Sequence, residues 1–213
     1  MTLTYHFWYT LSKIAARFFF NYRVIHPERL LEEGPVILAS NHQSYFDPPL
    51  VGICSRRDVY YLARKTLLDA PMLGNLLPHI NVIPVDRDGN DMSALKKIIR
   101  LVRSGNGVVL FPEGTRSPDG TLQRGKSGIG LIIAKTGAPV QPIRIFGSYE
   151  AFPKKSGNAS GKITMTPISV VVGEPLRFSK EELDSGSHGG DERALYQHLS
   201  DRVMAAIAEL RLP

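Results

Sequence analysis

The sequence lacks several features that mark common classes of protein. Its 213 residues include a single cysteine, Cys54, so no internal disulfide can form. None is needed in a reducing compartment. Cys54 lies in an apolar run, which predicts a small core residue. No run of about 18 apolar residues occurs, so no membrane-spanning helix is expected. Repeats and low-complexity segments are also missing, and the length favours one globular domain.

Two chemical signatures are missing as well. The nucleophile pattern G-x-S-x-G occurs only in near misses such as GKSGI around Ser127, and no cluster of Cys and His predicts a metal site. The chain is instead basic, because 26 Lys and Arg outnumber 20 Asp and Glu to give a net charge of +6 and a pI of about 9.5. Such a balance favours anionic partners, which leaves nucleic acid, anionic lipid and phosphorylated substrates open.

Apolar runs alternate with amphipathic segments along the chain. The runs predict strands at residues 22–27, 34–40, 57–65, 81–87, 107–114, 139–148 and 162–173. Helical periods and stop signals predict helices at residues 1–20, 47–55, 91–105, 127–137 and 192–210, with a Gly- and Ser-rich linker at 180–192. We therefore expect an α/β fold, a single domain at residues 21–213 with a central mixed, largely parallel sheet flanked by helices. In such sheets ligands bind at the carboxyl ends of the strands.

The N-terminal helix at residues 1–20 is amphipathic. Lys13 and Arg17 are four residues apart and share one face. An apolar stripe opposes them, formed by Phe7, Leu11, Ile14 and Phe18. This pattern fits a helix on a membrane surface, with basic residues near the headgroups and aromatic rings at the acyl boundary. It fits equally a helix that packs its stripe on its own domain.

Polar residues follow two of the predicted buried strands. NHQSYFDP begins at Asn41, and its His42 and Asp47 are spaced so that a tight turn into a helix brings the carboxylate to the imidazole. The carboxylate would fix the tautomer and stabilise the imidazolium, making His42 a general base worth about 10²–10⁴-fold in rate. Without a dedicated nucleophile, such a pair suits activation of a substrate hydroxyl. The alternative is a histidine that only hydrogen-bonds a turn.

The second strand end is PEGTRSP, which contains Glu113, Gly114, Thr115 and Arg116. Glycine lets the backbone approach a ligand closely, and arginine binds phosphate bidentately. The alternative is a solvent-exposed turn in which Glu113 and Arg116 form an ion pair and bind no ligand.

The two motifs together resemble the glycerolipid acyltransferase family, and most nearly its 1-acyl-glycerol-3-phosphate acyltransferases. The family's N-H-x-x-x-x-D motif is intact at residues 41–47, and E-G-T-R is intact at residues 113–116. Two further motifs follow the family's order with one departure each. NVIPVDR has Asn81 where glycine is usual, and APVQPI has Gln141 where an aliphatic residue is usual. The resemblance covers roughly residues 35–148, within an acyltransferase domain at 21–213.

The resemblance implies transfer of an acyl group from acyl-CoA or acyl-acyl-carrier protein to the sn-2 hydroxyl of a lysophospholipid, giving phosphatidic acid. His42 would be the base and Asp47 would orient it. Arg116 would bind the acceptor phosphate, with Glu113 holding Arg116 or the glycerol. Further phosphate contacts would come from Lys65, Arg87 and the turn at Gly125 and Lys126, beside Gly114 and Thr115. The resemblance implies neither a metal nor a bound cofactor.

The same resemblance favours the membrane-surface interpretation of the N-terminal helix, because both acceptor and product are lipids. It implies a peripheral protein on the cytoplasmic face of an anionic membrane, with no nucleic-acid partner. Two other functions remain open. One is an acyltransferase for another lyso-lipid or polyol phosphate acceptor, and the other is a non-catalytic membrane-binding domain of the same fold.

One competing motif is GTLQRGKS at residues 120–127, which matches the phosphate loop G-x-x-x-x-G-K-[ST]. A phosphate loop directly follows a buried strand, whereas PEGTRSPD separates this match from the predicted strand. SPDG is typical of a turn, so we expect a substrate-side turn here instead of an ATP site.

Overall fold

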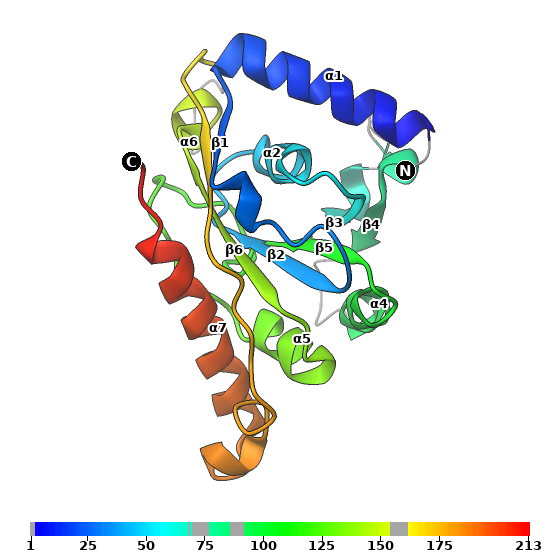
Figure 1. The fold of residues 1–213 in the computed structure, drawn as a ribbon, viewed down its shortest axis with the longest axis vertical. Coiled ribbons are helices and arrows are strands. Elements are labelled where there is room, and N and C mark those ends of the chain that lie inside the picture. Colours follow the sequence, from blue (N-terminus) through cyan, green and yellow to red (C-terminus); the bar gives the residue numbers. More distant parts are fainter. Residues whose placement is uncertain (1–2, 68, 70–76, 86–91, 154–161) are drawn as a thin grey trace.

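The computed structural model describes residues 3–67, 69, 77–85, 92–153 and 162–213, whose fold is drawn in Figure 1. The strands are β1 (Arg23–Ile25), β2 (Val36–Ser40), β3 (Val59–Arg64), β4 (Val82–Val85), β5 (Gly107–Leu110), β6 (Val140–Phe146) and β7 (Ser169–Val172). The helices are α1 (Leu3–Phe20), α2 (Asp47–Cys54), α4 (Met92–Arg103), α5 (Gly128–Thr136), α6 (Ser148–Ala151) and α7 (Glu192–Glu209).

The strands form one sheet with the order β1-β7-β6-β2-β5-β3-β4. Every neighbouring pair is parallel except β6 and β7, which are antiparallel. In the middle, β2 aligns Val36 with Gly107 of β5 and Ile37 with Val140 of β6. The predicted mixed, largely parallel sheet is thus confirmed. Because β2 and β5 are parallel neighbours, their carboxyl ends meet at the same edge of the sheet.

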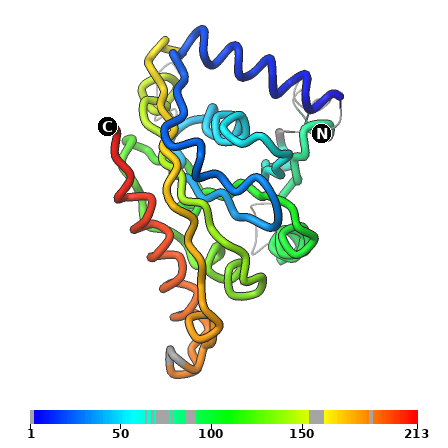
Figure 2. Tube along the Cα trace, in the orientation of Figure 1, coloured from blue at the N-terminus to red at the C-terminus, as the bar shows by residue number. Residues whose placement is uncertain are grey.

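Successive residues of β2 enter two separate cores. Val36 and Leu38 pack with α2 and the end of α1, whereas Ile37 and Ala39 pack with α4, α5 and α7. Figures 1 and 2 show these two groups of helices on opposite sides of the sheet. A strand that is buried on both faces needs apolar residues at every position, which explains the continuous run VILA before Ser40.

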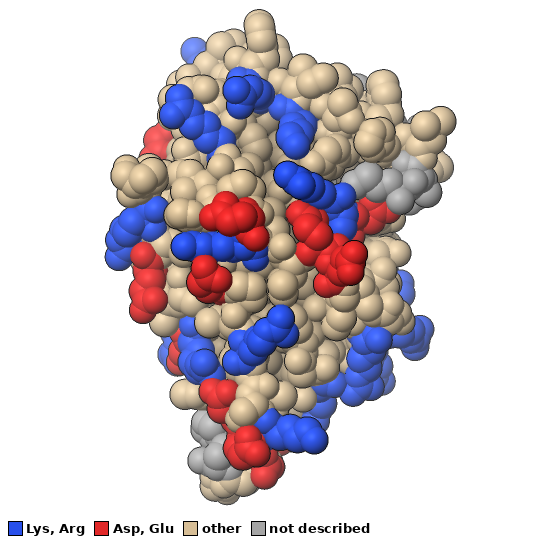
Figure 3. All heavy atoms as spheres, viewed as in Figure 1, with Lys and Arg blue, Asp and Glu red and all other residues tan. Residues whose placement is uncertain are grey.

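Helix α1 leaves its apolar stripe in solvent. Phe18 is 81% exposed, Ile14 63% and Phe7 59%. The stripe therefore does not pack on the chain's own domain, and that interpretation of the amphipathic pattern is wrong. Figure 3 shows basic side chains and no acidic ones over α1, in keeping with its Lys13 and Arg17 and its lack of Asp and Glu.

A different side of α1 attaches it to the domain. Tyr5 and Ala16 are buried, and the Tyr5 hydroxyl accepts a hydrogen bond from the backbone N–H of Val59 at 3.3 Å. The Tyr9 hydroxyl donates to the carbonyl of Ile53 in α2, also at 3.3 Å. The helix is thus held by polar aromatic residues, while its most apolar side chains face outward.

The C-terminal third departs from the sequence prediction at three places. The strand expected at residues 162–173 shortens to β7, because Pro167 has no N–H to donate to a ladder. Thr164 and Ile168 donate instead to the carbonyls of Ala151 and Phe20. The expected linker contains a 3-10 turn at Ser185–His188, and α6 is too short to produce a recognisable period.

Candidate active site

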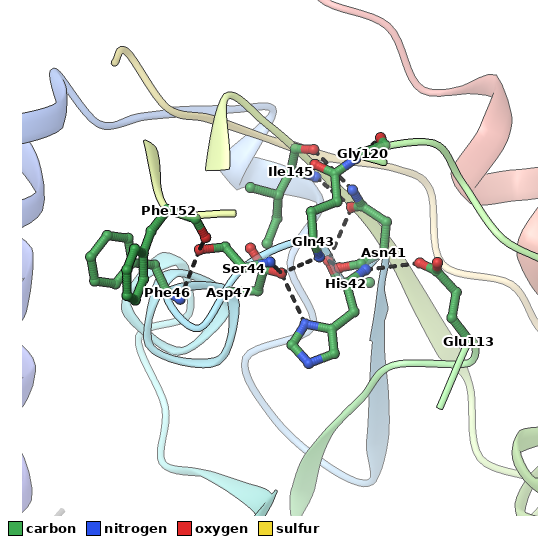
Figure 4. Close-up of polar contacts among 11 residues, drawn as sticks. Asn41, His42, Gln43, Ser44, Phe46, Asp47, Glu113, Gly120, Ile145 and Phe152 are labelled. Carbon is green, nitrogen blue, oxygen red and sulfur yellow. Dashed lines mark hydrogen bonds and ion pairs between the residues drawn. The ribbon is translucent and has the colours of Figure 1, made fainter. Parts of the chain in front are cut away.

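Two loops meet at the carboxyl edge of the sheet: the β2–α2 loop (residues 41–46) and the β5–α5 loop (residues 111–127). The β2–α2 loop starts with a buried side chain, Asn41, that imitates a strand (Figure 4). Its Oδ1 accepts from the N–H of Ile145 at 2.7 Å, and its Nδ2 donates to the carbonyl of Ile145 at 3.0 Å. This pairing continues the contact between β2 and β6, so it fixes where His42 leaves the sheet.

His42 and Asp47 form the hydrogen bond that their spacing predicts. Asp47 begins α2 and is fully buried, and its Oδ2 lies 2.9 Å from Nδ1 of His42. The same oxygen accepts from the N–H groups of Gln43 at 2.5 Å and Ser44 at 2.6 Å. Because this oxygen acts as an acceptor toward all three groups, Nδ1 of His42 donates and Nε2 is left as the basic nitrogen.

The imidazole is also held from the side. It stacks on Phe111, with ring centroids 4.1 Å apart and planes inclined by 20°. Only 13% of the His42 side chain is exposed, and among the described residues none hydrogen-bonds to Nε2. Phe111 was outside the predicted site residues; its only signal in the sequence is its place directly before Pro112 and Glu113. The ring is thus fixed in orientation while Nε2 stays available.

In the part of the chain that the structure describes, Glu113 hydrogen-bonds to the backbone and not to Arg116, and the predicted contact with the glycerol stays a prediction. It makes no hydrogen bond or ion pair with Arg116 among the described residues; its two oxygens accept from backbone N–H groups of His42 at 2.8 Å and Gln123 at 3.1 Å. Burial raises the pKa of Glu113 to about 7, against the lowering effect of these two hydrogen bonds. Glu113 therefore braces the two loops together, since a buried backbone N–H requires an acceptor.

Two more hydrogen bonds join the loops. The N–H of Ser117 donates to the carbonyl of His42 at 2.7 Å, and the side-chain amide of Gln43 donates to the carbonyl of Gly120. The position of the catalytic candidate is therefore set by both loops at once.

Arg116 is held by an aromatic ring instead of an acidic group. Its guanidinium carbon lies 3.4 Å from the centroid of the Tyr45 ring. Its Nη1 is buried, and among the described residues it has no hydrogen-bond partner. A buried charged donor without a partner is costly, which marks a position where an anion would bind.

Gly114, Thr115 and Lys126 lie beside this arginine in the β5–α5 loop. Gly114 has a φ of +68°, and a Cβ built there would lie 3.0–3.2 Å from carbon and nitrogen atoms of the Lys126 side chain. Thr115 is half-buried, whereas the side chain of Lys126 is exposed. The structure thus places a second cation, Lys126, beside Gly114, which lies two residues before Arg116 in the same loop.

Other predicted site residues lie elsewhere. Gly125 faces α7, where a Cβ would meet Ser200 and Met204, and its carbonyl accepts from Gln197 at 3.0 Å. Gly125 therefore packs the loop on α7, and its contact with a substrate stays a prediction. Lys65 is exposed in a 3-10 turn directly after β3, on the same edge of the sheet. Arg87 lies outside the described residues.

The segment GTLQRGKS is not arranged as a phosphate loop. β5 ends at Leu110 and α5 begins only at Gly128, so no strand leads directly into these residues. Gly120 has a φ of +81° and lies against the ring of Tyr149, whose hydroxyl donates to the carbonyl of Pro118 at 3.1 Å. Gly120 is thus a turn glycine, as SPDG predicts.

The described residues contain no group of three or more His, Cys, Asp or Glu that could hold a metal ion. None of their helices is both long and apolar enough to cross a bilayer.

This geometry agrees with comparisons to known proteins. The Acyltransferase family model matches residues 21–146, so the chain belongs to that family. It is 34% identical over 154 residues to the chloroplastic 1-acyl-sn-glycerol-3-phosphate acyltransferase BAT2 of Brassica napus, covering 71% of this chain and 43% of that protein. It is 31% identical over 159 residues to the 1-acyl-sn-glycerol-3-phosphate acyltransferase of Bacillus subtilis, covering 72% and 73%.

A solved structure has the same fold over nearly the whole chain. The crystal structure of the 1-acyl-sn-glycerophosphate (LPA) acyltransferase PlsC from Thermotoga maritima superimposes with a TM-score of 0.70 at 26% identity. The match covers 96% of this chain and 80% of that one. The chain spans less than half the length of the plant relatives, 43% of the Brassica protein and 42% of the chloroplastic LPAT1 of Arabidopsis thaliana.

Proposed function

We propose that this protein transfers a fatty acyl group from a thioester to the sn-2 hydroxyl of 1-acyl-glycerol-3-phosphate, giving phosphatidic acid. The observation that carries the proposal is the buried Asp47 carboxylate 2.9 Å from Nδ1 of His42. His42 lies in a loop that is hydrogen-bonded to the one bearing Arg116, whose buried Nη1 has no hydrogen-bond partner among the described residues. The relatives named as 1-acyl-sn-glycerol-3-phosphate acyltransferases support this acceptor.

In the proposed reaction His42 acts as the general base. Nε2 takes the proton of the acceptor hydroxyl while its oxygen forms a bond to the thioester carbonyl carbon. Asp47 holds the imidazole in the required tautomer and stabilises the imidazolium. When the intermediate collapses, the carbon–sulfur bond breaks and the imidazolium returns the proton to the departing sulfur. The thiol and the ester leave, and the enzyme ends in its starting protonation state.

The acceptor phosphate is placed on the cationic turn. Arg116 offers N–H donors in one plane, and Lys126 adds a second charge beside Gly114. Lys65, at the same edge of the sheet, and Arg87 are further candidates for phosphate contact. Gly114 has no Cβ, so a phosphate can approach the backbone closely at this turn.

The acyl donor is acyl-CoA or acyl-acyl-carrier protein, and it is a co-substrate. Both present the same thioester to the base, and the phosphates of CoA and the acidic surface of a carrier protein each suit a chain with a net charge of +6. A resident cofactor or metal is not required by this chemistry, since the thioester is already activated.

The membrane surface is proposed as the second partner. The exposed stripe of α1 would enter the acyl boundary of an anionic membrane on its cytoplasmic face, with Lys13 and Arg17 at the headgroups. This would make the protein peripheral and bring the site to a substrate that resides in the bilayer. A nucleic-acid partner is not part of this proposal.

A panel assay tests the reaction. Purified protein is incubated with lysophosphatidic acid and a series of acyl-CoA and acyl-acyl-carrier protein donors, with thiol release and phosphatidic acid measured together. The expected result is phosphatidic acid from the wild type and none from His42→Ala. Thiol release without phosphatidic acid would mean that the acyl group passes to water, and the assay would then be repeated with other lyso-lipid and polyol phosphate acceptors. Lipid binding without any turnover, unchanged in His42→Ala, would indicate a non-catalytic membrane-binding domain.

A further inference from the structure

Arg116 is positioned without being neutralised. The described residues give it no hydrogen bond and no ion pair, and the contact that places its guanidinium is the stack on Tyr45 at 3.4 Å. A stacked guanidinium keeps its N–H donors free in its own plane, whereas a carboxylate partner would occupy two of them. Stacking thus fixes a cation without using its N–H donors.

Tyr45 is itself held by a row of aromatic rings. Its ring lies 5.7 Å from that of Phe152, Phe152 lies 5.2 Å from Phe46, and Phe46 lies 5.3 Å from Phe20 at the end of α1. The loop is also attached by a side chain, because Ser44 Oγ donates to the carbonyl of Phe152 at 2.8 Å. Tyr45 is 53% exposed, but its ring is still held in place by its contact with Phe152.

Tyr45 also lies between His42 and Asp47 in the sequence, in the same loop as His42. Any shift of the ring would move Arg116 relative to the imidazole, and so would move a phosphate relative to the base. No hydrogen bond to the Tyr45 hydroxyl is found among the described residues, so the ring itself carries the contact.

We propose that Tyr45 is a positioning residue that holds Arg116 for the acceptor's phosphate and sets its distance from His42. This inference rests on the proposed function. It assigns acceptor affinity to a residue of the β2–α2 loop, although the phosphate-binding charge belongs to the β5–α5 loop.

Steady-state kinetics on variants test it. Tyr45→Leu should raise KM for lysophosphatidic acid about tenfold, the loss expected for a partly desolvated cation–π contact, and leave KM for acyl-CoA unchanged. Tyr45→Phe keeps the ring and should restore the wild-type KM. The matched control is Phe178→Leu, which removes the ring over Arg202 on α7, 4.9 Å away, and should change neither KM.

The double variant gives the sharpest result. In an Arg116→Ala background, Tyr45→Leu should add no further increase in KM, because the two residues act through one contact. An unchanged KM in Tyr45→Leu, an equal increase in the Arg116→Ala background, or a Tyr45→Phe variant as impaired as Tyr45→Leu would each overturn the inference.

A binding measurement separates this inference from the reaction. The dissociation constant of a short-chain lysophosphatidic acid is measured by calorimetry on His42→Ala and on His42→Ala combined with Tyr45→Leu. About tenfold weaker binding by the second protein supports the role of Tyr45 whether or not the wild type turns over. Equal binding by the two proteins contradicts it, even if the wild type makes phosphatidic acid.

Discussion

The β2–α2 loop and the β5–α5 loop lie side by side at one edge of the sheet but treat their polar groups in opposite ways. In the β2–α2 loop, Oδ2 of Asp47 accepts from Nδ1 of His42 and from two backbone N–H groups. In the β5–α5 loop, Arg116 keeps a buried Nη1 without a partner among the described residues.

The difference follows from what each loop is proposed to do. A general base must keep one tautomer and one direction before the substrate arrives, so its partners belong to the protein. An anion site must keep its donors unsatisfied until the ligand supplies the acceptor, and stacking on Tyr45 allows this. Changes to His42 or Asp47 should therefore lower kcat, and changes to Arg116 or to the Tyr45 ring that holds it should raise the acceptor KM.

The largest effect is expected for Asp47→Asn. The amide cannot fix the His42 tautomer as the carboxylate does, so kcat for phosphatidic acid formation should fall by about 10²–10⁴-fold with a small change in acceptor KM. An amide N–H₂ facing the N–H groups of Gln43 or Ser44 should also cost about 1–3 kcal/mol in the free energy of unfolding. Kinetics and urea titration measure both effects. A kcat within a few-fold of the wild type would remove Asp47 from the mechanism.

Arg116→Ala should be next in size and should act on the other parameter. A charged hydrogen bond is worth about 1.5–3 kcal/mol, so the acceptor KM should rise by about 10–100-fold. The free energy of unfolding should not fall, because the side chain that is removed has a buried Nη1 without a partner among the described residues. Arg202→Ala is the control, because Arg202 lies on α7 and is ion-paired with Glu182. A lower kcat with an unchanged acceptor KM in Arg116→Ala would contradict the proposal that Arg116 binds the acceptor.

Membrane attachment should respond to the exposed stripe of α1. Phe18→Glu replaces a ring that is 81% exposed, and loss of its burial in lipid should weaken binding to anionic vesicles by about tenfold or more. Turnover of a soluble short-chain acceptor should not change. Leu212→Glu, at another exposed apolar residue (48%), should leave vesicle binding intact. Equal sedimentation of wild type and Phe18→Glu with vesicles would argue against this surface.

The smallest expected effect is on the pH dependence of the free energy of unfolding, and it comes from Glu113, which joins the two loops. The pKa of Glu113 is about 7 in the folded protein and 4.5 for an ordinary glutamate, so between these pH values the folded state holds a proton that the unfolded state releases. The free energy of unfolding should therefore fall as pH rises from about 4.5 to 7, by on the order of 1–2 kcal/mol from this group. Urea titrations across that range should show a shallower decline for Glu113→Gln. Parallel curves would exclude Glu113 as the source.

Much of the fold follows from local pattern. The run VILAS predicts β2 because both faces of that strand are covered, and glycines end α4 and α5 where the sequence places them. Asn81 shows why a departure from the family pattern is tolerated. It stands where glycine is usual and adopts a φ of +58°, a conformation that asparagine accepts more readily than most residues.

The site was less predictable where roles depend on long-range contacts. The spacing of His42 and Asp47 predicts their hydrogen bond, because a turn and one helix start decide it. The bond of Glu113 to the backbone of His42, the packing of Gly125 on α7 and the stack of Phe111 on His42 each join segments far apart in sequence. Gln141 is similar, since its buried amide donates to the carbonyl of Gly173 and accepts from the N–H of Leu31.

The most direct test is a comparison of Asp47→Asn and Arg116→Lys, measured beside the wild type as phosphatidic acid formed over a range of lysophosphatidic acid concentrations. The structure predicts a low kcat with near-normal acceptor KM for Asp47→Asn, and a raised acceptor KM with a smaller change in kcat for Arg116→Lys. A wild-type kcat in Asp47→Asn, or the same kinetic change in both variants, would contradict the division between a prearranged base and an open anion site.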